Sequence, residues 1–253
     1  MEFDFTIVGA GIAGATLAAQ LAAHGRVLLL ERESQPGMHA TGRSAAMFME
    51  SYGAPQARAL TRASRAAYES AGVLSPRGVL YVAWRGQEAL LAGQLATLQA
   101  SGSAVQRVDA AAALTRVPVL QPDGLIGAIA EDGAMDIDVH TLHQQALRDA
   151  RALGATLWTD AELEVARYGA GGWTLAVAGA RTLRTHVLVD AAGAWADTVA
   201  QRAGLAPLGL QPRRRSAFTF DAPGHEHRGW PSVVGIDEGW YFKPDAGQLL
   251  GSP

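Results

Sequence analysis

The sequence GAGIAG at residues 9–14 separates a short apolar run from a helix-forming stretch, and it restricts the fold more than any other feature. The run Phe3–Val8 has the length and the glycine boundary of a buried strand. Ile12–Ala23 consists mostly of good helix formers, and Gly25 is typical of a left-handed helix cap. Val27–Leu30 is apolar without alternation, as expected for a strand covered on both faces. Strand, helix and strand in succession predict a right-handed βαβ unit.

The spacing of these glycines is typical of a dinucleotide-binding turn. Gly9 permits the tight turn, Gly11 lets the backbone approach a pyrophosphate, and Gly14 lets helix and strand pack closely. The free N–H groups at the start of the helix then face the phosphates. Glu31 stands at the end of the second strand, where its carboxylate can accept both ribose hydroxyls. A carboxylate there disfavours a 2′-phosphate, so NADP is not expected.

Two further segments bear on the choice between NAD and FAD. The small-residue stretch Ala40–Ala46 follows Pro36-Gly37, where a nicotinamide-binding fold usually continues into another βαβ crossover. Such a stretch can wrap a longer cofactor, although a mobile loop has the same composition. Val189–Trp195 reads as a strand that ends in small residues and enters a helix. It could contact a cofactor or be an ordinary strand–helix turn, so both alternatives stay open from the residues alone.

Composition excludes several classes of protein. With 49% hydrophobic and 18% charged residues the chain can bury a full core. The net charge of −3 gives no broad attraction to nucleic acid, and without cysteine there is neither a disulfide nor a flavin attached through sulfur. His225 and His227 flank Glu226, but no further ligand is near in sequence, so no metal site is expected. We expect a cytoplasmic protein without a secretory signal or membrane span, with peripheral attachment to the inner membrane left open.

The rest of the chain predicts an alternation of helices and strands. Helices are expected at 57–71, 88–99, 110–113 and 139–153, with strands at 78–84, 163–168, 173–177, 187–191, 214–220 and 240–243. The sequence ends just after a further strand-like segment. A sheet that stops there would have an unpaired edge, so we expect a C-terminally truncated protein.

Taken together, these motifs resemble the D-amino acid oxidase superfamily of FAD-dependent oxidoreductases, and most of all the bacterial FAD-dependent D-arginine and D-amino acid dehydrogenases. The resemblance rests on the following segments: GAGIAG (9–14), HGRVLLLERESQPG (24–37), ATGRSAA (40–46), SYGAPQARALTRASR (51–65), SPRG (75–78), VDAAGAW (189–195), LGLQPRRRSAF (208–218) and WYFKPDAGQLLGSP (240–253). It implies an α/β fold: a Rossmann-like FAD-binding domain of the GR2 type, interleaved with an α+β substrate domain built on a mixed sheet. The implied FAD-binding domain comprises residues 1–75 and 137–213, and the substrate domain comprises 76–136 and 214–253.

The resemblance also implies which residues hold the cofactor. Non-covalent FAD would be bound by Gly9, Gly11, Ile12, Ala13, Gly14, Glu31, Arg32, Thr41, Gly42, Arg43, Ser44, Ala45, Ala46, Ala192, Gly193 and Trp195.

For the reaction, the resemblance implies hydride transfer from the substrate Cα to flavin N5, giving an imino acid that hydrolyses to a 2-oxo acid and ammonia. Arg215 is the expected carboxylate-binding residue, since a guanidinium donates two parallel bonds, although a run of three arginines can also be a solvated edge. Tyr241 and Tyr52 match tyrosines of the substrate site; either can also be an ordinary half-buried aromatic. Met47 and Val79 stand where arginine-type enzymes carry a histidine and a glutamate. We therefore predict a preference for neutral or hydrophobic D-amino acids.

Other functions remain open. The same scaffold could carry a glycine- or sarcosine-type amine oxidase or a 2-hydroxyacid dehydrogenase, and a truncated chain could be an inactive flavin-binding fragment. An NAD-only Rossmann protein is a more distant alternative. The expected partners are a small amino-acid substrate and a quinone-type or other electron acceptor. The sequence does not fix the oligomeric state.

Overall fold

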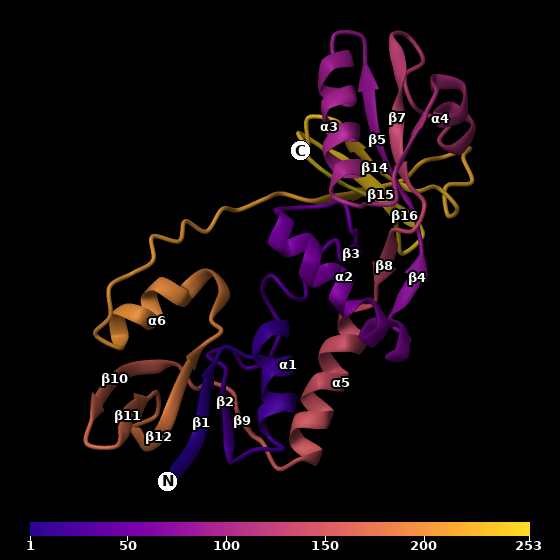
Figure 1. Ribbon diagram of the computed structural model, residues 1–253. Helices are drawn as coiled ribbons and strands as arrows, with labels where there is room; N and C mark the ends of the chain where they lie inside the picture. The colour runs from indigo at the N-terminus through magenta and orange to yellow at the C-terminus, as the bar shows by residue number, and fades with distance from the viewer. The chain divides into compact units, whose positions relative to one another are not determined.

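The computed structural model describes residues 1–253, and the chain forms two compact units, each built from two segments (Figure 1). The first unit comprises Met1–Ser44 and Val139–Arg213, and the second comprises Ala45–Asp138 and Arg214–Pro253. Residues 45–75 were predicted to belong to the domain that contains the glycine turn. In the structure these residues lie in the second unit, because two of its short strands pair there with a third strand from the same unit.

The first unit is built on a six-stranded sheet in the order β10-β11-β12-β1-β2-β9. Its strands are β1 (Glu2–Val8), β2 (Val27–Leu30), β9 (Thr156–Trp158), β10 (Leu163–Gly169), β11 (Gly172–Val177) and β12 (Arg181–Asp190). Strands β12, β1, β2 and β9 are parallel, whereas β10 and β11 form an antiparallel hairpin that pairs with β12. The predicted βαβ unit and hairpin are therefore confirmed. Strand β12 begins earlier than the apolar stretch that predicted it.

Both faces of this sheet are covered, which explains why β2 is apolar without alternation. Leu29 packs on one face with α1 (Ile12–Leu21) and α5 (Val139–Ala152). Leu28 and Leu30 pack on the other face, together with Val199 of α6 (Ala196–Arg202). A strand whose successive side chains enter two different cores has no polar face to present.

The end of α1 corrects one detail of the sequence analysis. The helix ends at Leu21, and Gly25 does not have the positive φ of a left-handed cap. A Cβ on Gly25 would lie 2.8 Å from Oδ2 of Asp4, the same atom that accepts a hydrogen bond from the Arg26 N–H at 2.7 Å. Gly25 is therefore required by the close approach of Asp4 rather than by a cap.

The second unit is built on a seven-stranded mixed sheet in the order β13-β16-β15-β14-β5-β7-β6 and a small sheet in the order β3-β8-β4. The large sheet contains β5 (Val79–Trp84), β6 (Gln106–Val108), β7 (Leu125–Glu131), β13 (Phe218–Phe220), β14 (Ser232–Gly235), β15 (Tyr241–Asp245) and β16 (Gln248–Ser252). The small sheet contains β3 (Met47–Phe48), β4 (Leu74–Pro76) and β8 (Met135–Ile137). The helices are α2 (Pro55–Ser70), α3 (Glu88–Ala100) and α4 (Ala110–Arg116).

The large sheet is covered by a different helix on each face. Leu91 and Leu98 of α3 pack with Val79 and Tyr81, whereas Ala113 of α4 packs with Leu80 and the other face. The last strand, β16, was expected to leave an unpaired edge. Instead it pairs with β15 on one side and β13 on the other, so β13 is the edge strand on that side of the sheet.

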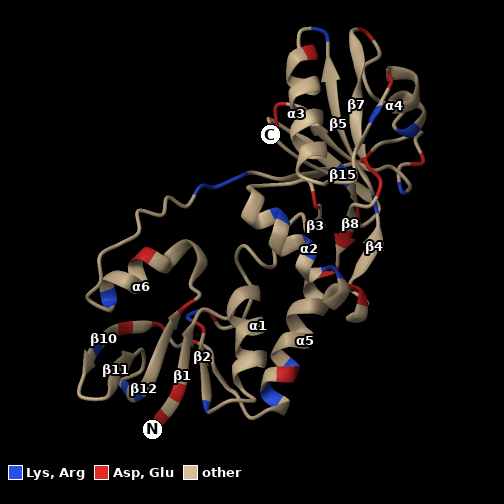
Figure 2. Cartoon of the chain, in the orientation of Figure 1, with Lys and Arg blue, Asp and Glu red and all other residues tan.

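One predicted strand is mostly absent. The segment Arg214–Phe220 was expected to be extended and paired, but only Phe218–Phe220 forms a strand, and Arg213–Arg215 lie on an exposed irregular stretch, coloured blue in Figure 2. Residues 211–217 have no backbone partner in either sheet, since β16 offers pairing only as far as Gly251. No helix of the chain is both long enough and apolar enough to cross a bilayer.

Candidate functional site

A cavity of about 300 Å³ lies in the first unit at the carboxyl ends of the parallel strands. Val8 ends β1 and Leu30 ends β2, and both line the cavity together with Ala191, which follows β12. Ligands of open parallel sheets bind where neighbouring strands end and the chain turns into helices. This cavity is therefore the candidate cofactor site.

The glycine turn allows the backbone to pack closely beneath this cavity. Gly9 has φ +102°, and a Cβ there would lie 2.5 Å from the carbonyl oxygen of Ala191. A Cβ on Gly14 would lie 1.9 Å from the carbonyl oxygen of Gly9. Gly11 differs from both, because it lines the cavity and an added Cβ would meet only the Thr41 hydroxyl, at 3.1 Å. Gly9 and Gly14 are thus required by the fold, and Gly11 leaves room for a ligand.

The N-terminus of α1 opens onto the cavity. Its N-cap, Gly11, carries no side chain, and the first turn contains no acidic residue. The Ile12 N–H donates to the Thr41 hydroxyl at 3.0 Å. The other N–H groups of a first helical turn have no partner within the helix and can bind an anion. The buried His143 side chain contacts the carbonyl oxygen of Ala10 through Nε2 at 2.8 Å. This contact helps to hold the glycine turn in place.

Glu31 places a nearly buried carboxylate at the end of β2, where it is 9% exposed. Oε2 accepts from the Ala10 N–H at 3.1 Å, and Oε1 accepts from the Glu33 N–H at 3.0 Å. Each carboxylate oxygen can accept a second hydrogen bond. The two backbone bonds thus orient the group and leave capacity for two ligand hydroxyls.

Aromatic and charged side chains form one wall of the cavity. The Arg32 guanidinium lies 4.1 Å from the centre of the Trp195 ring, and the His39 ring lies 4.7 Å from the same side chain. Glu33 joins them, with Oε1 at 2.8 Å from His39 Nε2 and 3.0 Å from Arg32 Nε. Hydrogen bonds from His39 and then Arg32 lower the pKa of the Glu33 carboxyl.

Most of the predicted cofactor residues line this one cavity: Gly9, Gly11, Ile12, Ala13, Glu31, Arg32, Thr41, Ala192, Gly193 and Trp195. Gly14 and Gly42 do not line it, because each packs against backbone; the Gly42 N–H donates to the Gly37 carbonyl at 2.8 Å. Arg43 and Ser44 are exposed and lie outside the cavity, and Ala45 and Ala46 belong to the second unit.

Sequence reasoning missed the contribution of α6 and the start of β10. Thr198 and Arg202 of α6 line the cavity, as does Glu162, and Arg202 Nη1 lies 2.6 Å from Glu162 Oε1. The sequence feature that could have indicated this contribution is the position of α6 directly after the segment Val189–Trp195. Helices that follow a strand at this edge of a parallel sheet start beside the ligand.

The predicted substrate residues are all in the second unit, but they occupy different environments. Arg215 is exposed on the irregular segment before β13, and Tyr52 is exposed just before α2. Tyr241 is half-buried on β15, and Met47 is half-buried on β3. Val79 is 1% exposed and packs in a core cluster that Met47 borders. Val79 is therefore inside the core rather than at a surface, and the Lys243 ammonium group lies 4.0 Å from Met47 Sδ.

A buried lysine fixes the segment that precedes Met47. Lys243 of β15 is 4% exposed; its Nζ donates to the Ala45 carbonyl at 2.8 Å and lies 2.6 Å from Asp136 Oδ1. Asp136 Oδ2 also pairs with Arg77 Nε, at 2.7 Å. Ala46 has φ +44°, a left-handed conformation that a non-glycine residue rarely adopts.

A second polar group is buried beside Val79. Glu131 lies directly across from Val79 in the β5–β7 pair and accepts hydrogen bonds from the Ser51 hydroxyl and, at 2.8 Å, from the Glu50 N–H. The Tyr81 hydroxyl is 2.9 Å from Ser51 Oγ. Burial raises the pKa of both Glu131 and Tyr81.

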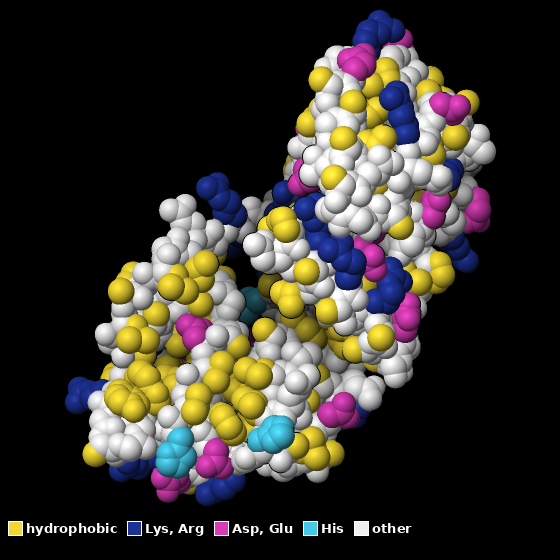
Figure 3. Space-filling view, in the orientation of Figure 1, with side chains coloured by type: hydrophobic (Ala, Val, Ile, Leu, Met, Phe, Trp, Pro, Cys, Tyr) yellow, Lys and Arg dark blue, Asp and Glu magenta, His cyan; other side chains and the backbone are white.

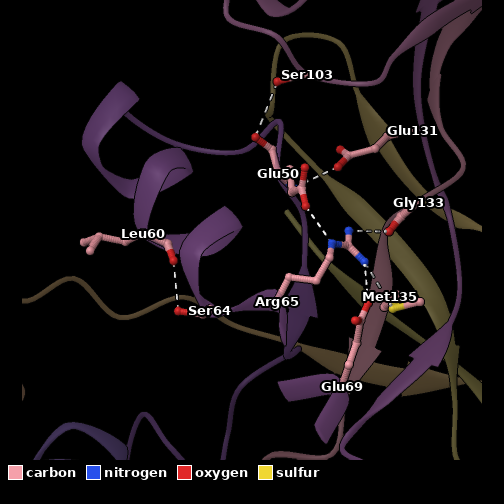
Figure 4. Close-up of polar contacts among 9 residues, drawn as sticks. All are labelled: Glu50, Leu60, Ser64, Arg65, Glu69, Ser103, Glu131, Gly133 and Met135. Carbon is pink, nitrogen blue, oxygen red and sulfur yellow. Dashed lines mark hydrogen bonds and ion pairs between the residues drawn. The ribbon is translucent and has the colours of Figure 1, made fainter. Parts of the chain in front are cut away.

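Glu50 links this group to α2 (Figure 4). Its carboxylate pairs with Arg65 Nε at 2.8 Å, and Arg65 also reaches the Gly133 carbonyl at 3.3 Å. The Arg65 guanidinium lies 4.7 Å from the centre of the Phe48 ring. No sequence pattern indicated these contacts, because their partners are far apart in the chain.

Comparisons with known proteins agree on the fold. The model of the family described as FAD dependent oxidoreductase matches residues 4–252. Glycine oxidase from Geobacillus kaustophilus is 26% identical, with a TM-score of 0.84, over 100% of this chain and 71% of that chain. Iminodiacetate oxidase from Chelativorans sp. BNC1 is 26% identical, with a TM-score of 0.75, over 98% and 70%. L-alpha-glycerophosphate oxidase from Mycoplasma pneumoniae, solved with FAD bound, has a TM-score of 0.87 over 100% and 71%; at 18% identity it shows the fold alone.

Proposed function

Since the chain belongs to the FAD-dependent oxidoreductase family, we propose that it oxidises the amine of a neutral or hydrophobic D-amino acid. The products would be an imino acid, which hydrolyses to a 2-oxo acid and ammonia. FAD, held non-covalently, supplies the two-electron acceptor. The electrons would then pass to a quinone-type or other acceptor.

The cavity in the first unit fits this cofactor. Glu31 offers two carboxylate oxygens, already oriented by backbone N–H groups, to the ribose hydroxyls. The N-terminus of α1 offers N–H groups to a pyrophosphate, and Gly11 leaves the space for it. Trp195 and Arg32 would cover the nucleotide from the side.

Residues of the second unit would bind and orient the substrate. We assign the substrate carboxylate to Arg215, whose exposed guanidinium always carries its charge. The phenols of Tyr52 and Tyr241 can donate to the same carboxylate, since a phenol carries one O–H donor. Holding the carboxylate and the side chain fixes the direction of the Cα–H bond, which is the main demand of this chemistry on the protein.

The observation that supports the choice of substrate is that neither position offers a carboxylate to a cationic side chain: Val79 is buried in an apolar cluster, and Met47 Sδ lies 4.0 Å from the Lys243 ammonium group. A cationic side chain placed there would lose its hydration without gaining an ionic partner. The nearest candidate partner along the strand pair is Glu131, but its carboxylate is buried and engaged by Ser51 and Glu50. An apolar side chain gains about 25 cal/mol per Å² buried.

Anaerobic mixing of the FAD-loaded protein with single D-amino acids tests this proposal. D-methionine, D-leucine and D-phenylalanine should bleach the flavin faster than D-arginine at equal concentration. Faster bleaching by D-arginine would contradict the proposed substrate class.

A second candidate function is oxidation of glycine, sarcosine or another small amine. It is favoured by the two solved structures at 26% identity, a glycine oxidase and an iminodiacetate oxidase. Bleaching by glycine or sarcosine but not by D-leucine would support this candidate, and release of hydrogen peroxide in air would identify oxygen as the acceptor.

A further inference from the structure

A second cavity, of about 570 Å³, lies in the second unit beside α2 and α3. Tyr52 and Arg58 line it from the α2 side, and Glu238 lines it from the turn between β14 and β15. The α3 side contributes Leu90, Gln94 and Thr97. Of the residues that the proposed function assigns to the substrate carboxylate, Tyr52 lines this cavity, whereas Arg215 and Tyr241 do not.

Arg58 is the unexplained group of this cavity. It is the one buried residue of α2, at 9% exposed, and its Nε is buried without a hydrogen-bond partner. Its guanidinium forms no ion pair or hydrogen bond in the unit. Arg65 on the same helix is instead fully engaged by Glu50 and Glu69 (Figure 4). Figure 3 shows the basic side chains gathered over α2.

An unpaired guanidinium in this position is costly. Arginine cannot shed its proton, so burial cannot be relieved by neutralisation. Of its guanidinium nitrogens, Nε is the one that is buried without a partner, and a buried N–H donor that has lost water without gaining an acceptor destabilises the fold. Because the chain supplies no carboxylate to Arg58, an anionic ligand in the cavity would supply the missing partner.

The charges of the cavity select the class of ligand. Glu238 brings a carboxylate to the same cavity, which disfavours a simple anion such as phosphate. A molecule with both a carboxylate and an ammonium group matches Arg58 and Glu238 together. Leu90 and Ala89 offer apolar surface for a side chain, and Tyr52, Gln94 and Thr97 offer hydrogen-bonding groups.

We propose that this cavity binds a free α-amino acid, with its carboxylate on Arg58 and its ammonium group on Glu238. The choice of an amino acid rests on the proposed function, in that this is the substrate class of the same chain. The site would be a second place of contact with the substrate, beside Tyr52 and independent of Arg215.

The test uses the flavin-free 253-residue chain and the NMR signals of arginine Nε–H groups. Titration with D-leucine should shift the Arg58 signal. Arg58→Met should weaken D-leucine binding by about tenfold or more, as expected for loss of a charge-assisted hydrogen bond. Arg62→Met is the matched control, because Arg62 lies one turn further along α2, also has a buried unpartnered nitrogen, and does not line the cavity. It should leave the affinity unchanged.

A second variant and two comparison ligands test the same site independently. If Arg58→Met does not fold, Arg58→Lys keeps the charge but not the planar fork, and should bind D-leucine more weakly than the wild type. The 2-oxo acid 4-methyl-2-oxopentanoate and inorganic phosphate lack an ammonium group, so both should bind more weakly than D-leucine. Glu238→Gln removes the proposed partner of the ammonium group and should therefore reduce the difference in affinity between D-leucine and these two anions. An unmoved Arg58 signal, or phosphate that binds as tightly as D-leucine, would overturn the proposal. No flavin is involved, so failure here is distinguishable from failure of the proposed oxidation.

Discussion

At the scale of single residues, buried polar groups influence how the stability of the fold depends on pH, and Glu131 is the clearest example. Glu131 is 3% exposed and lies across from Val79, which belongs to an apolar cluster. Burial raises its pKa, and the hydrogen bonds from Ser51 and Glu50 offset only part of that effect. The fold therefore favours the protonated carboxyl more than the unfolded chain does.

This shift predicts how stability depends on pH. Protonated Glu131 stabilises the native state below its ordinary pKa of 4.5, and that contribution is lost as the pH rises through the raised pKa of the folded state. Glu131→Gln cannot lose a proton. The free energy of unfolding of the wild type, relative to Glu131→Gln, should therefore fall from acid to neutral pH in urea titrations.

The control for this measurement is Glu164→Gln, which changes an exposed carboxyl on β10. It should show no comparable trend with pH. A wild-type advantage over Glu131→Gln that grows toward neutral pH would show that the ionised carboxylate is the stabilising form.

We expect the glycines of the turn to have different roles: Gly14 is required for folding, whereas Gly11 is required for cofactor binding. Gly14→Ala would place Cβ 1.9 Å from a backbone oxygen, so we expect a loss of about 3 kcal/mol in the free energy of unfolding. Gly11→Ala meets only the Thr41 side chain at 3.1 Å, and it should fold with nearly wild-type stability but bind FAD poorly. Thermal unfolding together with FAD titration distinguishes the two variants. Equal losses of stability in both would contradict this division of roles.

At the scale of elements, the second unit depends on one charged junction between its two sheets. Asp136 of β8 holds Lys243 of β15 and the Arg77 side chain at the same time. Asp136→Asn would leave two largely buried cations without a carboxylate, and we expect it to cost about 3 kcal/mol or more. Lys243→Met removes one cation and leaves the Arg77 pair intact, so its cost should be smaller. Urea unfolding of both variants tests the order, and a greater loss in Lys243→Met would contradict it.

The elements also show how far sequence reasoning extends. Strands β1, β2, β10 and β11 were predictable, because continuous or bounded apolar runs follow directly from burial. The short strands β3, β4 and β8 were not predicted, because their pairing joins distant segments and leaves no periodicity in two or three residues. Arg214–Phe220 read as a strand from its composition, although a strand forms only where β16 provides a partner.

At the scale of the whole molecule, the cavity proposed for the cofactor was more predictable than the residues proposed to bind the substrate. The turn at Gly9 and the carboxylate of Glu31 lie in one local βαβ unit, so their spacing in sequence already fixes their proximity. Glu131 and Lys243 belong to networks whose partners come from separate segments, and Arg58 Nε is buried without any partner. No local pattern marks such residues, and only the fold shows that they are buried.

The most direct test of the proposed function is the affinity of the 253-residue chain for FAD, measured by titration of the apoprotein. Wild-type protein should bind FAD, and Glu31→Gln should weaken binding by about tenfold or more through the loss of charge-assisted hydrogen bonds. Glu164→Gln, on an exposed position of β10 outside the cavity lining, should bind nearly as well as the wild type. A wild-type chain that binds no FAD, or a Glu31→Gln variant of unchanged affinity, would contradict the assignment of this cavity to the flavin nucleotide.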